Sequence, residues 1–125
     1  ATIALGNRYA GLMGDEKAIK KVQNAATEAG ELVWHMPLPE ELRGLLNSDI
    51  ADIANVKIGN RAGGMLIGGL FLREFVGSEK GKKPAWAHLD IAGPANNDAA
   101  ACGHTPKGAT GVTVRTLVQL AKDLA

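Results

Sequence analysis

Residues 86–93, with the sequence Trp-Ala-His-Leu-Asp-Ile-Ala-Gly, constrain the fold more than any other stretch. In an extended chain the Trp, His and Asp fall on one face, and the first Ala, the Leu and the Ile fall on the other. Gly93-Pro94 then stops the strand sharply. Ligands of α/β proteins collect beyond the carboxyl ends of strands, so the pattern predicts a strand with a site in the loop after it.

The rest of the sequence predicts helices and linkers that pack against this strand. Residues 2–5 read as a second strand, and residues 6–14 read as a loop. Apolar residues at helical spacing predict a helix that starts near Asp15, whose carboxylate would cap the first turn. Gly30 can end this helix, but residues 31–33 can also continue its pattern.

Two further helices are expected in the second half of the chain. Residues 65–76 are apolar almost all round, which predicts a helix buried on most sides, with Gly68-Gly69 permitting close approach of another backbone. Residues 77–84 read as a solvated loop, and residues 96–108 as a long loop. The last helix is expected over 112–124, with one apolar stripe of Val114, Leu117, Val118, Ala121 and Leu124.

Composition excludes several classes of protein. A length of 125 residues favours one domain or part of one, and the abrupt start at a strand-like segment without an initiator Met suggests a fragment. The 14 basic and 13 acidic residues give a net charge of +1, and this balance gives no argument for a surface that binds nucleic acid or a membrane. No membrane-spanning run or signal peptide is visible, and the single Cys102 suits a reducing compartment.

His88 and Asp90 form the sharpest local pattern for chemistry. Two potential ligands on one face of a strand could hold zinc, with a third ligand from His104 or Asp98. The alternative is that the Asp orients the His, or that each side chain pairs with a neighbouring loop.

Other candidate groups favour structural interpretations. Cys102-Gly103-His104 could be a thiol nucleophile and its base, but neighbours in sequence seldom have that geometry, so a small loop or buried cysteine is favoured. His35 reads as a packing or surface residue. Four acidic residues read as caps and solvated positions rather than metal ligands: Asp15, Glu16, Asp49 and Asp52.

Two further stretches resemble binding motifs only in composition. Residues 59–64 are Gly-rich but lack the Gly-Lys-Ser/Thr ending of a phosphate loop, so they read as a flexible link. Lys80, Lys82 and Lys83 read as an exposed basic loop. The residues alone therefore describe an α/β piece with no complete catalytic constellation.

Several motifs along the chain together resemble one known protein family. Residues 86–93, followed by Gly-Ala-Thr-Gly-Val at 108–112 and Arg-Thr-Leu at 115–117, resemble the C-terminal end of the leucyl aminopeptidase family. Further matches run in the family's order over essentially the whole chain: Ala10–Met13, Gly30-Glu31, Trp34, Met36–Leu38, Glu41, Ser48, Ala51-Asp52, Asn55, Gly59, Arg61, Gly63-Gly64, Phe71-Leu72 and Phe75-Val76.

The resemblance implies a three-layer α/β/α metallo-exopeptidase domain with a mixed sheet, of which residues 1–125 are the C-terminal portion. Such enzymes are cytosolic hexamers in which two divalent ions, zinc or manganese, activate a water against the N-terminal peptide carbonyl. The family's metal ligands and catalytic groups lie upstream, in an Asn-Thr-Asp-Ala-Glu-Gly-Arg signature that this sequence lacks. We therefore expect no catalytic residue, no bound metal and no activity in this chain without the upstream half.

The resemblance also moves attention from His88 and Asp90, which match no family ligand, to the loop beyond them. It implies that Ala92 and Ala95 line the pocket for the first side chain of a peptide substrate, leaving room for Leu-sized groups; tight packing is the alternative. Two other functions remain open. One is a non-catalytic assembly module built on the apolar helix 65–76, and the other is an independent metal hydrolase using His88, Asp90 and His104.

Overall fold

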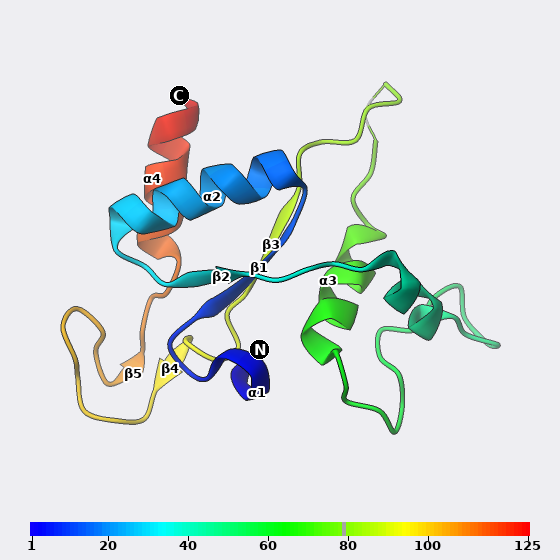
Figure 1. The fold of residues 1–125 in the computed structure, drawn as a ribbon, viewed down its shortest axis with the longest axis horizontal. Helices are drawn as coiled ribbons and strands as arrows, with labels where there is room; N and C mark the ends of the chain where they lie inside the picture. Colours follow the sequence, from blue (N-terminus) through cyan, green and yellow to red (C-terminus); the bar gives the residue numbers. More distant parts are fainter. Residues whose placement is uncertain (79) are drawn as a thin grey trace.

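The computed structural model describes residues 1–78 and 80–125 (Figure 1). The expected loop 77–84 includes Glu79, which lies outside the described residues. The elements in chain order are α1 (Thr2–Leu5), β1 (Ala10–Gly14), α2 (Glu16–Ala29), β2 (Val33–His35), the 3₁₀ helix η1 (Glu40–Leu46), α3 (Gly64–Arg73), β3 (Ala87–Asp90), β4 (Asn96–Asn97), β5 (Gly108–Ala109) and α4 (Val114–Leu124).

The main sheet has three strands in the order β2-β1-β3. β1 runs parallel to β2 and antiparallel to β3, so the sheet is mixed. Leu12 of β1 stands opposite His35 on one side and Leu89 on the other. β4 and β5 form a separate antiparallel ribbon.

Helices cover both faces of this sheet, as the resemblance implied. α2 and α4 lie on one side and α3 on the other (Figure 1). Leu12 packs with Ile19 and Val22 of α2, and Leu89 joins this cluster from β3. On the opposite face Met13 lies against Gly69 of α3. The alternation expected for residues 86–91 is therefore confirmed, and so is the α/β class with its layered, mixed sheet.

The first strand lies later in the chain than predicted. Residues 2–5 form the short helix α1, with Ile3 96% exposed, and the expected loop 6–14 contains β1. The strand Ala-Gly-Leu-Met-Gly has no alternation of apolar and polar residues because both of its faces are covered. Gly11 lets the Met65 side chain pack directly on the backbone of this strand. A Cβ on Gly11 would lie 2.5 Å from the Met65 sulfur, which is too close.

Helix α2 begins where predicted, but Asp15 acts differently from the expected cap. Its carboxylate accepts a hydrogen bond from the backbone N–H of Trp86 at 2.9 Å, and its own N–H donates to the Trp86 carbonyl at 2.9 Å. Within the described residues it makes no side-chain hydrogen bond to the first turn of its own helix. Gly30 ends α2 in the left-handed conformation, with φ 68°, which excludes continuation through 31–33.

Helix α3 is buried on one side rather than on most sides. Ile67, Gly69 and Leu70 are buried, while Leu72 is exposed. The expected close approach of another backbone at Gly68-Gly69 is wrong. Gly68 faces open space, and the neighbours of Gly69 are the side chains of Met13, Leu38 and His88.

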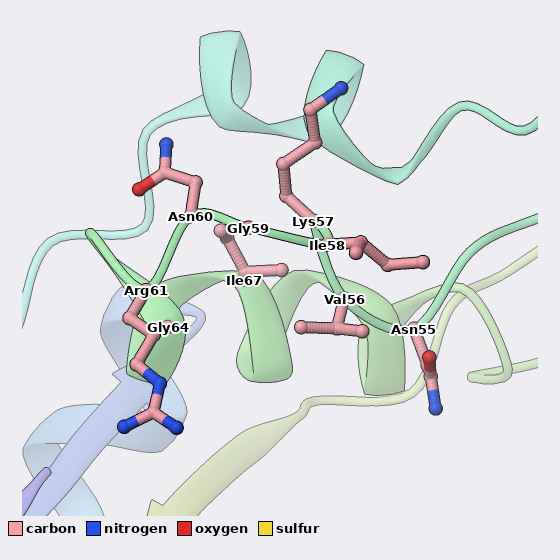
Figure 2. A pocket seen from close by; sticks show the side chains of 9 residues that line it. All are labelled: Asn55, Val56, Lys57, Ile58, Gly59, Asn60, Arg61, Gly64 and Ile67. Carbon is pink, nitrogen blue, oxygen red and sulfur yellow. The ribbon is translucent and has the colours of Figure 1, made fainter.

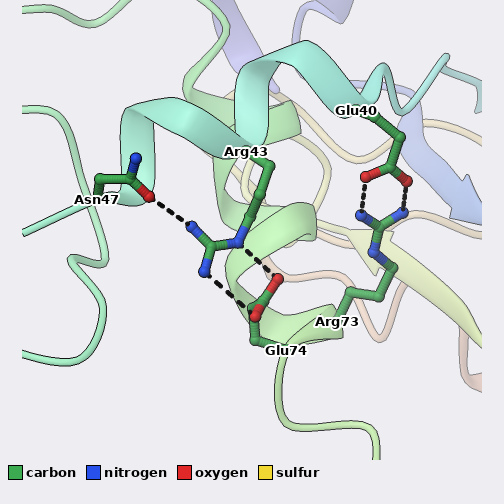
Figure 3. A network of polar contacts seen from close by, with 5 residues as sticks. All are labelled: Glu40, Arg43, Asn47, Arg73 and Glu74. Carbon is green, nitrogen blue, oxygen red and sulfur yellow. Dashed lines mark hydrogen bonds and ion pairs between the residues drawn. The ribbon is translucent and has the colours of Figure 1, made fainter.

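The 3₁₀ helix η1 is fixed to α3 by two ion pairs (Figure 3). Arg73 donates to both oxygens of Glu40, at 2.6 and 2.8 Å. Arg43 donates to Glu74 from Nε at 2.7 Å and from Nη2 at 3.3 Å, and its Nη1 donates to Asn47 at 3.2 Å. Bidentate pairs of this kind fix orientation as well as distance.

Acid is expected to weaken this connection. Hydrogen bonds from Arg73 and Arg43 lower the pKa values of Glu40 and Glu74, respectively, below their usual 4.5. The unfolded chain therefore binds more protons near that pH than the folded chain does. The stabilisation is fully present above pH 4.5 and is lost as pH falls through the lower folded-state pKa values. Both carboxylates are solvated, so the effect is modest.

The measurement is the midpoint of thermal unfolding at pH 7, 4.5 and 3. A Glu40→Gln/Glu74→Gln double variant serves as the control, and we expect a smaller fall between pH 4.5 and 3 than in the unchanged chain. Equal falls in the two proteins would contradict the assignment.

Candidate functional site

The turn at residues 91–95 follows β3 directly, at the position where the sequence pattern places a site. The Asp90 carboxylate accepts a hydrogen bond from the Ala92 N–H at 3.0 Å, and the Ala95 N–H donates to the Ile91 carbonyl at 3.0 Å. Gly93 and Pro94 are buried inside the turn. Ala92 is exposed and Ala95 is half-buried, so the two small side chains lie at the protein surface.

Thr110 holds this turn from one side. Its hydroxyl donates to the Pro94 carbonyl at 2.6 Å, and its N–H donates to the Ala95 carbonyl at 3.1 Å. The same hydroxyl accepts a hydrogen bond from the Val112 N–H at 3.2 Å. From the other side, the backbone of Gly6 packs so closely on Gly93 that a Cβ there would overlap the Gly6 carbonyl oxygen. The turn is therefore fixed by contacts from two distant segments.

His88 lies on the α3 side of the sheet and is half-buried. Its ring stacks on that of Trp86, with centroids 6.3 Å apart and planes 8° apart. Burial lowers the pKa of its imidazole below the usual 6.5, and the charge of Asp90 opposes that shift. The lowered pKa favours the neutral ring, and the stacking on Trp86 is typical of a packing role.

The structure does not assemble the zinc set considered from the sequence. Asp90 is engaged with the turn, Asp98 accepts from the Asn96 amide at 2.6 Å, and His104 contacts the Arg115 guanidinium. Among residues 1–78 and 80–125, no group of three or more His, Cys, Asp and Glu side chains could hold a metal ion. The described residues therefore do not fit a metal centre.

The other residues considered as candidates for chemistry are exposed at the protein surface. Cys102 is exposed, in a backbone bridge with Thr105, while its expected partner His104 is engaged with Arg115. His35 is exposed on β2. The acidic residues considered as caps or ligands are also exposed: Asp15, Glu16, Asp49 and Asp52.

A hollow of about 550 Å³ is lined in part by residues 59–64, which the sequence predicted to be a flexible link. Figure 2 shows Val56 and Ile67 between the loop and α3, with Lys57 and Arg61 extending away in opposite directions. The full lining is Asn55, Val56, Lys57, Ile58, Gly59, Asn60, Arg61, Gly64 and Ile67. The residue types of this stretch gave no signal for a hollow, because their convergence depends on how the loop folds over α3.

Comparison with known proteins identifies the family. The model of the cytosol aminopeptidase family, catalytic domain, matches residues 1–118. The chain belongs to the cytosol aminopeptidase family. The resemblance drawn from the motifs is therefore confirmed, and the chain corresponds to the C-terminal part of the catalytic domain.

Named relatives agree with this assignment. A probable cytosol aminopeptidase of Clavibacter michiganensis subsp. michiganensis is 57% identical over 123 residues, which are 95% of this chain and 24% of the relative. One from Leifsonia xyli subsp. xyli is 50% identical over 129 residues, covering 100% of this chain and 26% of the relative. The chain thus spans about a quarter of the length of these cytosol aminopeptidases.

Solved structures share the fold. The bottromycin maturation enzyme BotP superposes with a TM-score of 0.89 at 37% identity, over 98% of this chain and 26% of its own. BotP in complex with Mn gives a TM-score of 0.85 at 35% identity, over the same shares of the two chains. None of the helices formed by residues 1–78 and 80–125 has the length and apolar character needed to cross a membrane.

Proposed function

We propose that residues 1–125 are the C-terminal portion of the catalytic domain of a metallo-aminopeptidase that removes N-terminal residues, preferably Leu-like ones, from peptides. The match of residues 1–118 to the family's catalytic domain carries this proposal. The enzyme would act in the cytoplasm as a homo-hexamer. The names of the relatives and the single free cysteine, Cys102, support the location.

In this proposal the metals belong to the rest of the enzyme. Two divalent ions, zinc or manganese, would supply the hydrolytic chemistry of the intact protein, and a Mn complex of BotP supports manganese. Because the described residues offer no ligand group, the upstream half of the protein would hold the ions. This chain alone would then bind no metal in the family manner and hydrolyse no peptide.

The chain's own contribution would be scaffold and pocket wall. Ala92 and Ala95 each present only a methyl group, on a turn fixed by Asp90 and Thr110. Small side chains on a rigid turn leave room for a Leu-sized group and prevent the wall from collapsing into that room. We infer that this wall selects the first side chain of the substrate without taking part in bond cleavage.

A fusion protein tests the function directly. The part of the Clavibacter michiganensis aminopeptidase that lies outside the match is joined to residues 1–125, and hydrolysis of leucine p-nitroanilide is measured with Mn²⁺ or Zn²⁺. We expect turnover by the fusion and none above the metal blank by the 125-residue chain. Turnover by the short chain, or a folded fusion that remains inactive with either metal, would refute the proposal.

The pocket wall is tested in the same fusion by Ala95→Phe. A large ring in place of a methyl group is expected to raise KM for the leucine substrate about tenfold or more, with a much smaller change for the alanine analogue, because steric exclusion scales with substrate size. Ala101→Phe, on an exposed loop, is the matched control and should alter neither value. Equal effects on both substrates would point to tight packing instead of a pocket wall.

A further inference from the structure

Helix α4 carries large apolar residues on two sides. Its inner side packs on α2, where Leu120 joins the cluster of Ile19 and Val22, and Thr116 is fully buried. Its outer side holds the stripe expected from the sequence, but these side chains face outward: Val114 is 57% exposed, Leu117 52%, Val118 52% and Leu124 58%. A helix that is apolar on opposite sides is typical of one enclosed between two layers.

The outer face by itself is too small to hold two copies of this 125-residue chain together. A stable interface between protomers buries about 800 Å² on each partner, over some 20–30 residues. Four half-exposed side chains on one 11-residue helix supply a small part of that area. A contact within one polypeptide needs no such area, because the two surfaces are already held together by the chain.

In the relatives, the matching residues are part of a much longer polypeptide that could supply this contact. Members of the family that match this chain along nearly its whole length are about four times as long. BotP contains the same fold within a chain of which it makes up 26%. The fold seen here therefore persists when a much larger part of the protein is attached to it.

We propose that the outer face of α4, formed by Val114, Leu117, Val118 and Leu124, is an intramolecular docking surface for an apolar segment of the rest of the aminopeptidase polypeptide. This inference rests on family membership and on the exposure of α4, and it is independent of the proposed substrate and pocket. It gives α4 a defined position between α2 and a layer supplied by the remaining three-quarters of the enzyme.

Cysteine labelling tests the proposal. Val118→Cys is introduced in a Cys102→Ser background, both in the 125-residue chain and in the fusion with the Clavibacter michiganensis part. Maleimide modification is followed peptide by peptide with mass spectrometry. We expect the Val118→Cys site to react at least tenfold more slowly in the fusion than in the short chain. Asp123→Cys is the matched control, because Asp123 is exposed and lies about 140° round α4 from Val118, away from the proposed docking surface. It should react at similar rates in both proteins.

Two further measurements make each outcome decisive. Ala25→Cys, at a fully buried position of α2, reports whether the fold is intact, since it reacts slowly only in a folded chain. The aligned substitution in the Clavibacter michiganensis enzyme itself repeats the test without a fusion. Rapid labelling at position 118 with Ala25→Cys protected would overturn the proposal. Protection that disappears when oligomers are diluted to monomers would also overturn it and would assign the face to a second copy.

Discussion

Gly14→Ala is expected to leave the chain largely unfolded. Gly14 lies at the end of β1 opposite Ala87, with φ 145°. A Cβ at this position would overlap the carbonyl oxygen of Trp86 and lie 2.7 Å from the Cα of Ala87, so backbone rather than a flexible side chain would have to move. The movement would also separate Asp15 from the Trp86 N–H and carbonyl. We expect a loss of about 4 kcal/mol or more, comparable to the total stability of many small domains.

Gly68→Ala is the matched control for this substitution. Gly68 lies inside α3 and faces open space, so alanine there is expected to raise the free energy of unfolding by about 0.5–1 kcal/mol through helix propensity. Urea unfolding followed by circular dichroism measures both variants. If Gly14→Ala lowers the free energy of unfolding by less than about 1 kcal/mol, the close backbone approach at the end of β1 is wrong.

Glu31→Ala is the second substitution with a large expected effect. The Glu31 side chain is only 6% exposed, and its carboxylate accepts hydrogen bonds from the N–H groups of Thr113 and Thr116 at 2.9 and 2.8 Å. It also accepts from the Thr116 hydroxyl at 2.6 Å, and the Arg115 Nε lies 3.8 Å away. Glu31 thus caps α4 from a distant part of the chain. Removing a buried acceptor of three hydrogen bonds is expected to cost about 3–4 kcal/mol.

Two variants make this expectation specific. Glu28→Ala removes an exposed carboxylate that accepts one hydrogen bond from Gln119 of the same helix, so it should change the free energy of unfolding by less than about 0.5 kcal/mol. Glu31→Gln keeps one acceptor oxygen and should fall between the two. If Glu31→Ala proves no more damaging than Glu28→Ala in urea unfolding, the cap contributes little to stability.

The elements that the sequence predicted well have strong patterns of their own. Helix α2 repeats apolar residues at helical spacing and ends at a glycine, and β3 alternates cleanly between two covered faces. β1 lacks such a pattern because partners on both faces and a close backbone neighbour determine its residues. The apolar stripe of α4 was visible in the sequence, but periodicity gives only the existence of a face and not the direction in which it points.

The candidate site was less accessible to sequence reasoning. The strand pattern predicted a site in the loop after β3, but nothing in the residue types of Ala92 and Ala95 indicates a pocket wall, and only the family resemblance implied that role for them. The contacts that fix their turn come from Gly6 and Thr110, which are remote in sequence. Glu31 illustrates the same problem, because a glutamate after a helix-ending glycine gives no sign of the helix that it caps. In both cases the structural surroundings of a residue depend on a partner that local patterns cannot identify.

The distance along the chain between Glu31 and the helix that it caps has a consequence during protein synthesis. The capped N–H groups lie 82 and 85 residues downstream. Because ribosomes add about 5–20 residues per second, Glu31 emerges roughly 4–17 s before Thr116. Throughout that interval the α2 cluster lacks Leu120, and the Glu31 carboxylate lacks its partners in α4. Neither the Glu31 cap nor the contact of Leu120 with α2 can therefore form before the last helix has been synthesised.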